Sequence, residues 1–209
     1  MADPIENLIL GFDRALKTLH GSYVAERKNP ATDTTEGELA DSERDHVAGL
    51  MRVNHAGEIC AQALYEGQAL TAKSDQAREA LQKAAAEERD HLAWCRERLG
   101  ELQAKPSVLD PFFYGASYIM GALTGLAGDK ISLGFVEATE DQVVQHLDEH
   151  LLVLPESDHK SRVILDQMRE DEREHGAHAL AMGGEVFPGP VKKVMSLMSR
   201  VMTNTTYRF

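Results

Sequence analysis

Four glutamates and two histidines of this chain have the types and the spacing expected of a two-metal site. Each histidine follows a glutamate by three residues, which places both side chains on one face of a helix. Each of these pairs is preceded, at nearly the same distance along the chain, by another glutamate. The repeat predicts two half-sites that face one another, made from Glu58, Glu88, His91, Glu140, Glu172 and His175.

The glutamates occupy positions where a helix that packs into a core normally has apolar side chains. Around Glu140, for example, the same helical stripe carries Leu133, Val136, Val143 and Leu147. Buried carboxylates that converge repel one another, so they stay ionised only when cations lie among them. Two divalent ions balance four carboxylates, and mixed carboxylate and imidazole ligands suit iron or manganese. Such a ligand set is typical of di-iron carboxylate bundles.

The segments that must position these residues are predicted to be helical. Apolar spacing, caps and stop residues predict four main helices at residues 42–72, 75–99, 129–154 and 158–182. Ser42 with Asp45 is expected to cap the first helix, and Ser74 the second. Short connections make two helical hairpins, which the long segment 100–128 joins. No stretch alternates with the period of a strand, so we expect an all-α four-helix bundle with one long crossover.

Two smaller parts are predicted to flank the bundle, which takes up residues 41–183. Residues 1–40 are expected to form an N-terminal helix, Pro4–His20, followed by a polar linker. Residues 184–209 follow a proline-rich break and are expected to form a basic amphipathic tail.

The bulk composition narrows the function classes. The 209-residue chain has a formal net charge of −12, which argues against a nucleic-acid partner. Its two cysteines, Cys60 and Cys95, form no disulfide framework, which favours a reducing compartment. The first residues lack the basic start of a signal peptide and the arginine-rich character of a transit peptide. We therefore expect a bacterial chain or an already mature one.

The crossover contains an uncharged stretch, Pro111–Gly128, that is close to the length of a membrane span. A span would place the two hairpins on opposite sides of the bilayer and separate ligands that must meet, so we reject it. The stretch is expected to lie at a membrane interface or to line the substrate site; a helix buried against the bundle is the alternative. Its aromatic residues are Phe112, Phe113, Tyr114 and Tyr118. The tail adds charges suited to an anionic lipid surface, Lys192, Lys193 and Arg200.

Several other candidate residues have simpler interpretations. Cys95 lies on an inward stripe but is expected to pack as a small hydrophobe. Glu87 and Glu174 lie off the stripes and are expected to be exposed. His55, one helical turn before Glu58, borders the site and is a candidate to support a ligand. Surface positions are expected for His20, His46, His150 and His159.

Four sequence motifs make the chain resemble a known family. They are Val53–Glu58 (VNHAGE), Glu88–His91 (ERDH), Val136–Glu140 (VEATE) and Glu172–His175 (EREH). Residues 45 to 183 resemble the demethoxyubiquinone hydroxylases of ubiquinone biosynthesis. The resemblance implies a ferritin-like fold with two iron ions per chain. It also implies that all six residues named above are iron ligands, with Glu88 and Glu172 as the bridges.

The same resemblance implies the reaction and its place in the cell. Molecular oxygen would hydroxylate the ring of a demethoxy-polyprenyl benzoquinol, before a final O-methylation. The protein would attach peripherally to the cytoplasmic face of a bacterial inner membrane, or to the matrix side of the mitochondrial one. Other ubiquinone-biosynthesis proteins are candidate partners. His146, which stands after Gln145 where the family often has two histidines, and Tyr65 are candidates for substrate contact.

Three other functions stay open for a bundle of this kind. A ferritin-like protein that oxidises and stores iron uses similar ligands, although a long uncharged crossover would be a liability on a soluble shell. A manganese enzyme that disproportionates peroxide is the second. The third is a helical scaffold or lipid-binding protein whose polar seam is only structural.

Overall fold

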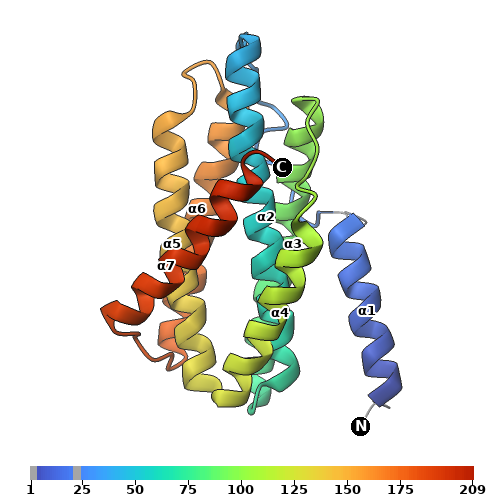
Figure 1. Cartoon of the computed structure of the whole chain (residues 1–209), viewed down its shortest axis with the longest axis vertical. Coiled ribbons are helices and arrows are strands. Elements are labelled where there is room, and N and C mark those ends of the chain that lie inside the picture. The colour runs from blue at the N-terminus through green and yellow to red at the C-terminus, as the bar shows by residue number, and fades with distance from the viewer. Residues whose placement is uncertain (1–3, 21–24) are drawn as a thin grey trace.

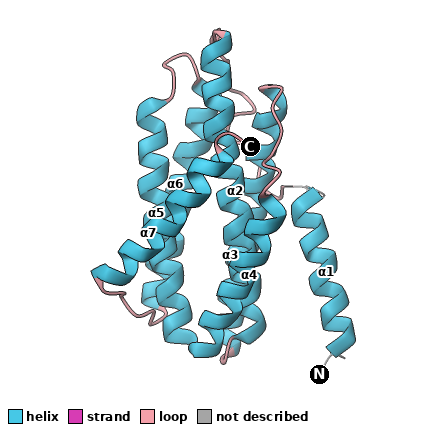
Figure 2. Ribbon diagram, in the orientation of Figure 1, coloured by secondary structure: helices cyan, strands magenta, loops and turns pink. Residues whose placement is uncertain are grey.

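The computed structural model describes residues 4–20 and 25–209, and within these ranges the chain forms seven helices and no strand (Figure 2). The all-α prediction is therefore confirmed, and the predicted helix ends agree to within a few residues. The helices are α1 (Pro4–His20), α2 (Asp41–Thr71), α3 (Asp75–Glu101), α4 (Asp110–Ala127), α5 (Asp129–Val153), α6 (His159–Ala181) and α7 (Gly189–Thr206).

Two antiparallel hairpins, α2 with α3 and α5 with α6, make up the four-helix bundle (Figure 1). The crossover contains α4, which runs along α2 and then connects to α5. α7 lies diagonally across α2 and α5, and α1 packs at the side against α2 and α4. This is the ferritin-like bundle with a long crossover and additional terminal helices that we expected from the sequence.

The helix starts show which capping predictions hold. Ser74 caps α3, because its Oγ accepts a hydrogen bond from the amide of Ala77 at 3.2 Å. The prediction for Ser42 was wrong. Instead, the Glu43 carboxylate accepts a hydrogen bond from the backbone amide of Ala40 at 2.9 Å. α2 therefore starts before Ser42, which lies inside the first turn.

The crossover helix α4 has two different faces. Gly67 of α2 and Gly121 of α4 bring the two backbones so close that a Cβ at either position would overlap the facing helix. Tyr114 of α4 also donates a hydrogen bond to buried Glu66 at 2.7 Å. The opposite face exposes the apolar side chains of Phe112, Ile119, Leu123 and Leu126. One face is thus packed against the bundle, and the other is free to contact an apolar surface.

Within residues 4–20 and 25–209, each helix is too short or too polar to span a lipid bilayer.

Apolar side chains fill the bundle above and below its middle. One cluster is formed by residues such as Met51, Trp94, Leu99, Leu147, Leu165 and Met168. The other contains Tyr65, Leu81, Leu133, Val136 and Ala179. The layer between these clusters is polar, and it contains the predicted ligands.

Candidate metal centre

The structure brings all six predicted ligand residues together in the middle layer of the bundle. Each of the four bundle helices contributes a glutamate, and every one of these glutamates is buried. The two hairpins contribute equivalent sets. The residues are Glu58 from α2, Glu88 and His91 from α3, Glu140 from α5, and Glu172 and His175 from α6.

Three carboxylates converge on one ring nitrogen of His91. Its Nδ1 lies 3.0 Å from Glu172 Oε1, 3.3 Å from Glu88 Oε2 and 3.4 Å from Glu58 Oε2. Donor atoms of these four residues all lie within 4.8 Å of one another. A ring nitrogen has one N–H direction and can satisfy only one of these oxygens, so the arrangement is better suited to a shared cation.

The second half of the centre is built around His175. Its Nδ1 lies 3.0 Å from Glu172 Oε2 and 3.3 Å from Glu88 Oε1. Glu88 and Glu172 thus direct one oxygen toward each histidine, which is the placement that the predicted bridging role requires. Glu140 belongs to this half, and the Tyr65 hydroxyl donates a hydrogen bond to it.

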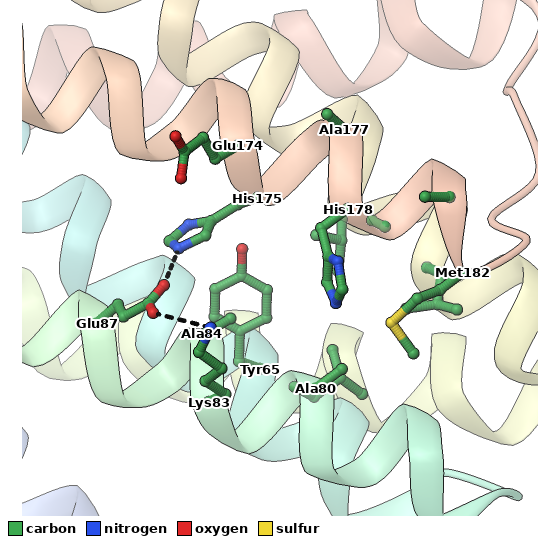
Figure 3. Close-up of a pocket in the computed structure, with 15 residues that line it drawn as sticks. Tyr65, Ala80, Lys83, Ala84, Glu87, Glu174, His175, Ala177, His178 and Met182 are labelled. Carbon is green, nitrogen blue, oxygen red and sulfur yellow. Dashed lines mark hydrogen bonds and ion pairs between the residues drawn. The ribbon is translucent and has the colours of Figure 1, made fainter.

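The outward ring nitrogens of the two histidines are held by acids from the opposite hairpin. His91 Nε2 lies 2.8 Å from Asp171 Oδ2, and His175 Nε2 lies 2.6 Å from Glu87 Oε2 (Figure 3). A carboxylate acceptor keeps a proton on Nε2, so Nδ1, which faces the glutamates, is the nitrogen that gives up its proton when a cation binds. The resulting tautomer is the one that a metal ligand needs.

Neither of these two acids was identified from the sequence, and the expectation that Glu87 is exposed was wrong. Its side chain is 35% exposed and it contacts His175, whereas Glu174 is exposed as expected. Each of the two acids immediately precedes a glutamate of the centre, Asp171 before Glu172 for example. That position on a helix faces the neighbouring hairpin. An acid at this position in both helices is the sequence pattern that could have identified Asp171 and Glu87.

Burial and mutual repulsion change the acidity of the glutamates. Burial raises the pKa of Glu58 well above its usual value, and the charge of Glu88 adds to this. Burial raises the pKa of Glu140 as well, followed by the charges of Glu172 and Glu88. Burial also opposes ionisation of Glu88, but hydrogen bonds from both histidines outweigh it and lower the pKa of Glu88. A cation among these carboxylates relieves the repulsion.

The histidines are correspondingly surrounded by negative charge. Burial alone would lower the pKa of His91, but hydrogen bonds with Asp171 and Glu172 raise it well above its usual value. Burial would lower the pKa of His175 too, but Glu172 and Glu88 outweigh it and raise this pKa to about 12. Positive charge is therefore strongly stabilised at both positions, as a cation site requires.

Two buried oxygens test whether a metal fits. Oε1 of Glu88 and Oε1 of Glu172 lie inside the bundle without a well-aligned hydrogen bond, although a histidine Nδ1 lies 3.3 Å from the first and 3.0 Å from the second. A buried carboxylate oxygen without a donor is unfavourable, and a bound cation satisfies it. Carboxylate oxygens with imidazole nitrogens are also the donor set that iron and manganese accept. This buried cluster is thus able to hold metal.

A pocket of about 490 Å³ reaches the centre from the His175 side, between α3 and α6. Tyr65, His175 and Glu87 lie at its inner end, and Figure 3 shows His178 and Met182 directed into the same space. The remaining wall is made mostly of small or apolar side chains: Ala80, Leu81, Ala84, Leu133, Val136, Ala177, Ala179 and Ala181. Tyr65 is therefore placed to contact a molecule in the pocket.

His146 does not line this pocket. Its ring lies 3.9 Å from that of His150, one turn later on α5. The expectation of a surface position for His150 was wrong, because the side chain is buried and burial lowers its pKa to about 3. Polarity alone predicts a surface position for this histidine, but it lies on the inward side of α5, one turn after His146.

Two other expectations concern residues near the centre. Cys95 is buried, with its Sγ 3.8 Å from the sulfur of Met168, which confirms its interpretation as a packed hydrophobe. The His55 Nδ1 lies 3.2 Å from a carboxylate oxygen of Asp110, and its Nε2 lies 3.3 Å from Arg96. The polar contacts of His55 are therefore with α3 and the start of α4.

Comparison with known proteins points in the same direction as the geometry. The family model described as "Ubiquinone biosynthesis protein COQ7" matches residues 24–206. A protein of Pseudomonas aeruginosa named 3-demethoxyubiquinol 3-hydroxylase is 56% identical over 98% of this chain and 96% of its own length. Proteins of the same name from Ectopseudomonas mendocina and Pseudomonas putida are 57% and 54% identical over the same shares.

Proposed function

Since this chain belongs to the COQ7 family of ubiquinone biosynthesis proteins, we propose that it is a di-iron monooxygenase of that pathway. Its substrate is a demethoxy-polyprenyl benzoquinol, whose ring it hydroxylates with molecular oxygen. The observation that carries the proposal is the pair of buried glutamate and histidine half-sites, in a chain similar over nearly its whole length to proteins named as this hydroxylase.

The proposed centre holds two iron ions. Glu58 and His91 bind one, Glu140 and His175 bind the other, and two glutamates bridge them. The bridges are Glu88 and Glu172, because each directs its two oxygens toward different histidines. Four carboxylates neutralise two ferrous ions, which supports this stoichiometry. Bound ferrous iron supplies the electrons that activate oxygen, and the protein supplies the geometry.

The side chains around the centre have positioning roles in this proposal. Asp171 and Glu87 hold the outward protons of the two histidines, which fixes both rings. Tyr65 holds Glu140 by a hydrogen bond. The apolar layers on either side of the cluster keep water from reacting there.

The pocket beside His175 is proposed as the binding site of the quinol ring. Its volume of about 490 Å³ lies within the range of small-molecule sites, and its walls are mainly apolar. It lies in the half of the bundle where α3 begins and α6 ends. That end also exposes the apolar side chains of Leu70, Leu126, Ile131, Leu180 and Val186, along which a polyprenyl tail can leave the pocket.

We further propose that the protein binds peripherally to the cytoplasmic face of a bacterial inner membrane. The exposed apolar face of α4 supports this, and α7 adds the exposed side chains of Val191, Val194, Leu197 and Val201. Lys193 and Arg200 are exposed on the same helix and favour an anionic surface, whereas Lys192 is paired with Glu137 at 3.0 Å.

The membrane proposal is tested by flotation with anionic liposomes. Phe112→Asp combined with Ile119→Asp should reduce flotation while leaving bound iron unchanged. Gln82→Asp combined with Gln145→Asp adds the same charge at exposed positions away from α4 and should float like the wild type. Equal flotation of all three proteins would exclude α4 as the contact surface.

The catalytic proposal is tested by aerobic incubation of the iron-loaded protein with a demethoxyquinol and a reductant. The product should gain one oxygen atom, and labelled oxygen gas rather than labelled water should supply it. A storage protein would consume oxygen and deposit ferric iron without altering the quinol. A peroxide-disproportionating enzyme would release oxygen from peroxide, and a scaffold would do neither.

A further inference from the structure

The loop between α1 and α2 reaches the outer side of the metal centre. Its described part, residues 25–40, passes behind the bundle in the view of Figure 1 and reaches the upper end, where α2 begins. Along this path Arg27 enters the space between α3 and α6. No local sequence pattern connects this polar linker with the centre.

Arg27 connects two helices that belong to different hairpins. Its Nε lies 2.9 Å from Asp90 of α3, and its Nη2 lies 2.8 Å from Asp171 of α6. The guanidinium also stacks over Trp94, 4.8 Å from the ring centre. Asp90 also accepts a hydrogen bond from the backbone amide of Glu26 at 2.7 Å, and this bond holds the loop in place. A planar guanidinium suits such two-sided binding, and an ammonium group does not.

The contact with Asp171 links Arg27 to a ligand residue. The oxygen of Asp171 that accepts from Arg27 is the same one that lies 2.8 Å from His91 Nε2. Asp171 is mostly buried, with 13% of its side chain exposed. Arg27 thus fixes the carboxylate that fixes the imidazole, and its Nη2 also lies 3.3 Å from His91 Nε2, so His91 has little freedom to rotate.

The corresponding acid of the other half, Glu87, has weaker support. Apart from His175 itself, its cationic contact among the described ion pairs is Lys83, at 3.6 Å on the same helix. The Lys83 side chain is 80% exposed, and exposed pairs of this kind contribute little. Glu87 and His175 also border the pocket. His175 is therefore held less firmly than His91.

We propose that Arg27 is a positioning residue that locks His91 and thereby makes the two metal positions unequal. The ion on the His91 side is retained more tightly, and the ion on the His175 side, next to the pocket, exchanges more readily. The inference rests on the proposed metal centre and adds to it a role for the N-terminal loop.

Titration of the metal-free protein with Co²⁺, followed by calorimetry and by visible absorption, tests the inference. The wild type should bind in two steps of different affinity. Arg27→Gln should weaken the tighter step by about 10- to 100-fold, the usual effect of removing a group that supports a metal ligand, and leave the weaker step unchanged. Arg27→Lys should fall between the two, and Lys28→Gln, an exposed neighbour, should match the wild type.

A second variant separates positioning from folding. Asp171→Asn should weaken the same step, and adding Arg27→Gln to it should cause little further loss, because Arg27 and Asp171 contact each other and the same ring nitrogen of His91. Additive losses, equal weakening of both steps, or no change in Arg27→Gln would overturn the inference while the metal centre stands. Failure of the wild type to bind Co²⁺ would overturn the metal centre and the inference together.

Discussion

The two halves of the candidate metal centre have the same residue types but different surroundings. Behind His91 stand Asp171 and then Arg27, and the N-terminal loop covers this side. Behind His175 stands Glu87, a partly exposed acid, and this side opens on the pocket. The ligand residues therefore define what binds, and the residues behind them define how firmly it is held and what can approach it.

This difference fits the demands of the proposed reaction. Oxygen is small, but a ring with a polyprenyl tail is large, so one side of the centre must be open. A site that is open on both sides would lose its metal and admit water. One closed half and one accessible half meet both requirements within a nearly symmetric bundle.

The largest effect is expected from the residues that both halves share. Glu88→Ala or Glu172→Ala removes an oxygen ligand from each metal position and should abolish hydroxylation and lower bound iron well below two per chain. Metal analysis and product formation measure this. Glu170→Ala, which removes an exposed acid of α6 outside the pocket, is the control and should keep both properties. Full iron and activity in the Glu88 and Glu172 variants would exclude their bridging role.

A smaller effect should separate the two halves. Asp171→Asn should reduce iron retention by about 10- to 100-fold, because His91 loses a strong acceptor that Arg27 keeps in place. Glu87→Gln should reduce it by less, since the acid is already partly exposed. Dialysis against a chelator, with iron measured over time, gives both values. Faster iron loss from Glu87→Gln than from Asp171→Asn would contradict the inference that His91 is held more firmly than His175.

A change in the pocket should affect substrate binding and leave iron in place. Ala84→Phe fills the space between α3 and α6, and we expect KM for the quinol to rise about tenfold, or about 1.4 kcal/mol. Gln82→Phe places the same ring at an exposed position of the same helix and serves as the control. An unchanged KM in Ala84→Phe would show that the quinol enters elsewhere.

The sequence was sufficient for the bundle and its six central residues because both follow from helical periodicity. A glutamate on an apolar stripe is visible without any structure, and so is a histidine three residues later. Arg27 and Asp171 are 144 residues apart, and no local pattern connects them. The pocket was equally hidden, because alanines such as Ala80 and Ala84 simply favour a helix. Contacts between distant segments decide such features.

The smallest effect is expected from the hydroxyl of Tyr65. It donates a hydrogen bond to Glu140, and burial together with the charge of Glu140 holds the Tyr65 pKa well above its usual value, so the phenol stays a donor. Tyr65→Phe keeps the ring and the pocket wall but leaves a buried carboxylate oxygen unsatisfied. The metal-free protein should lose about 1 kcal/mol, or about 2–4 °C in Tm. With iron bound the loss should shrink, because a metal on Glu140 compensates that oxygen.

Thermal unfolding of the wild type and Tyr65→Phe, with and without iron, measures the difference. Tyr65→Leu, which also removes the ring, should lower Tm in both states, since the side chain is fully buried in an apolar cluster. An equal loss in Tyr65→Phe with and without iron would mean that Glu140 gains nothing from the metal. Glu140 would then not be a metal ligand on the His175 side. The two halves of the centre would differ in their ligands as well as in their surroundings.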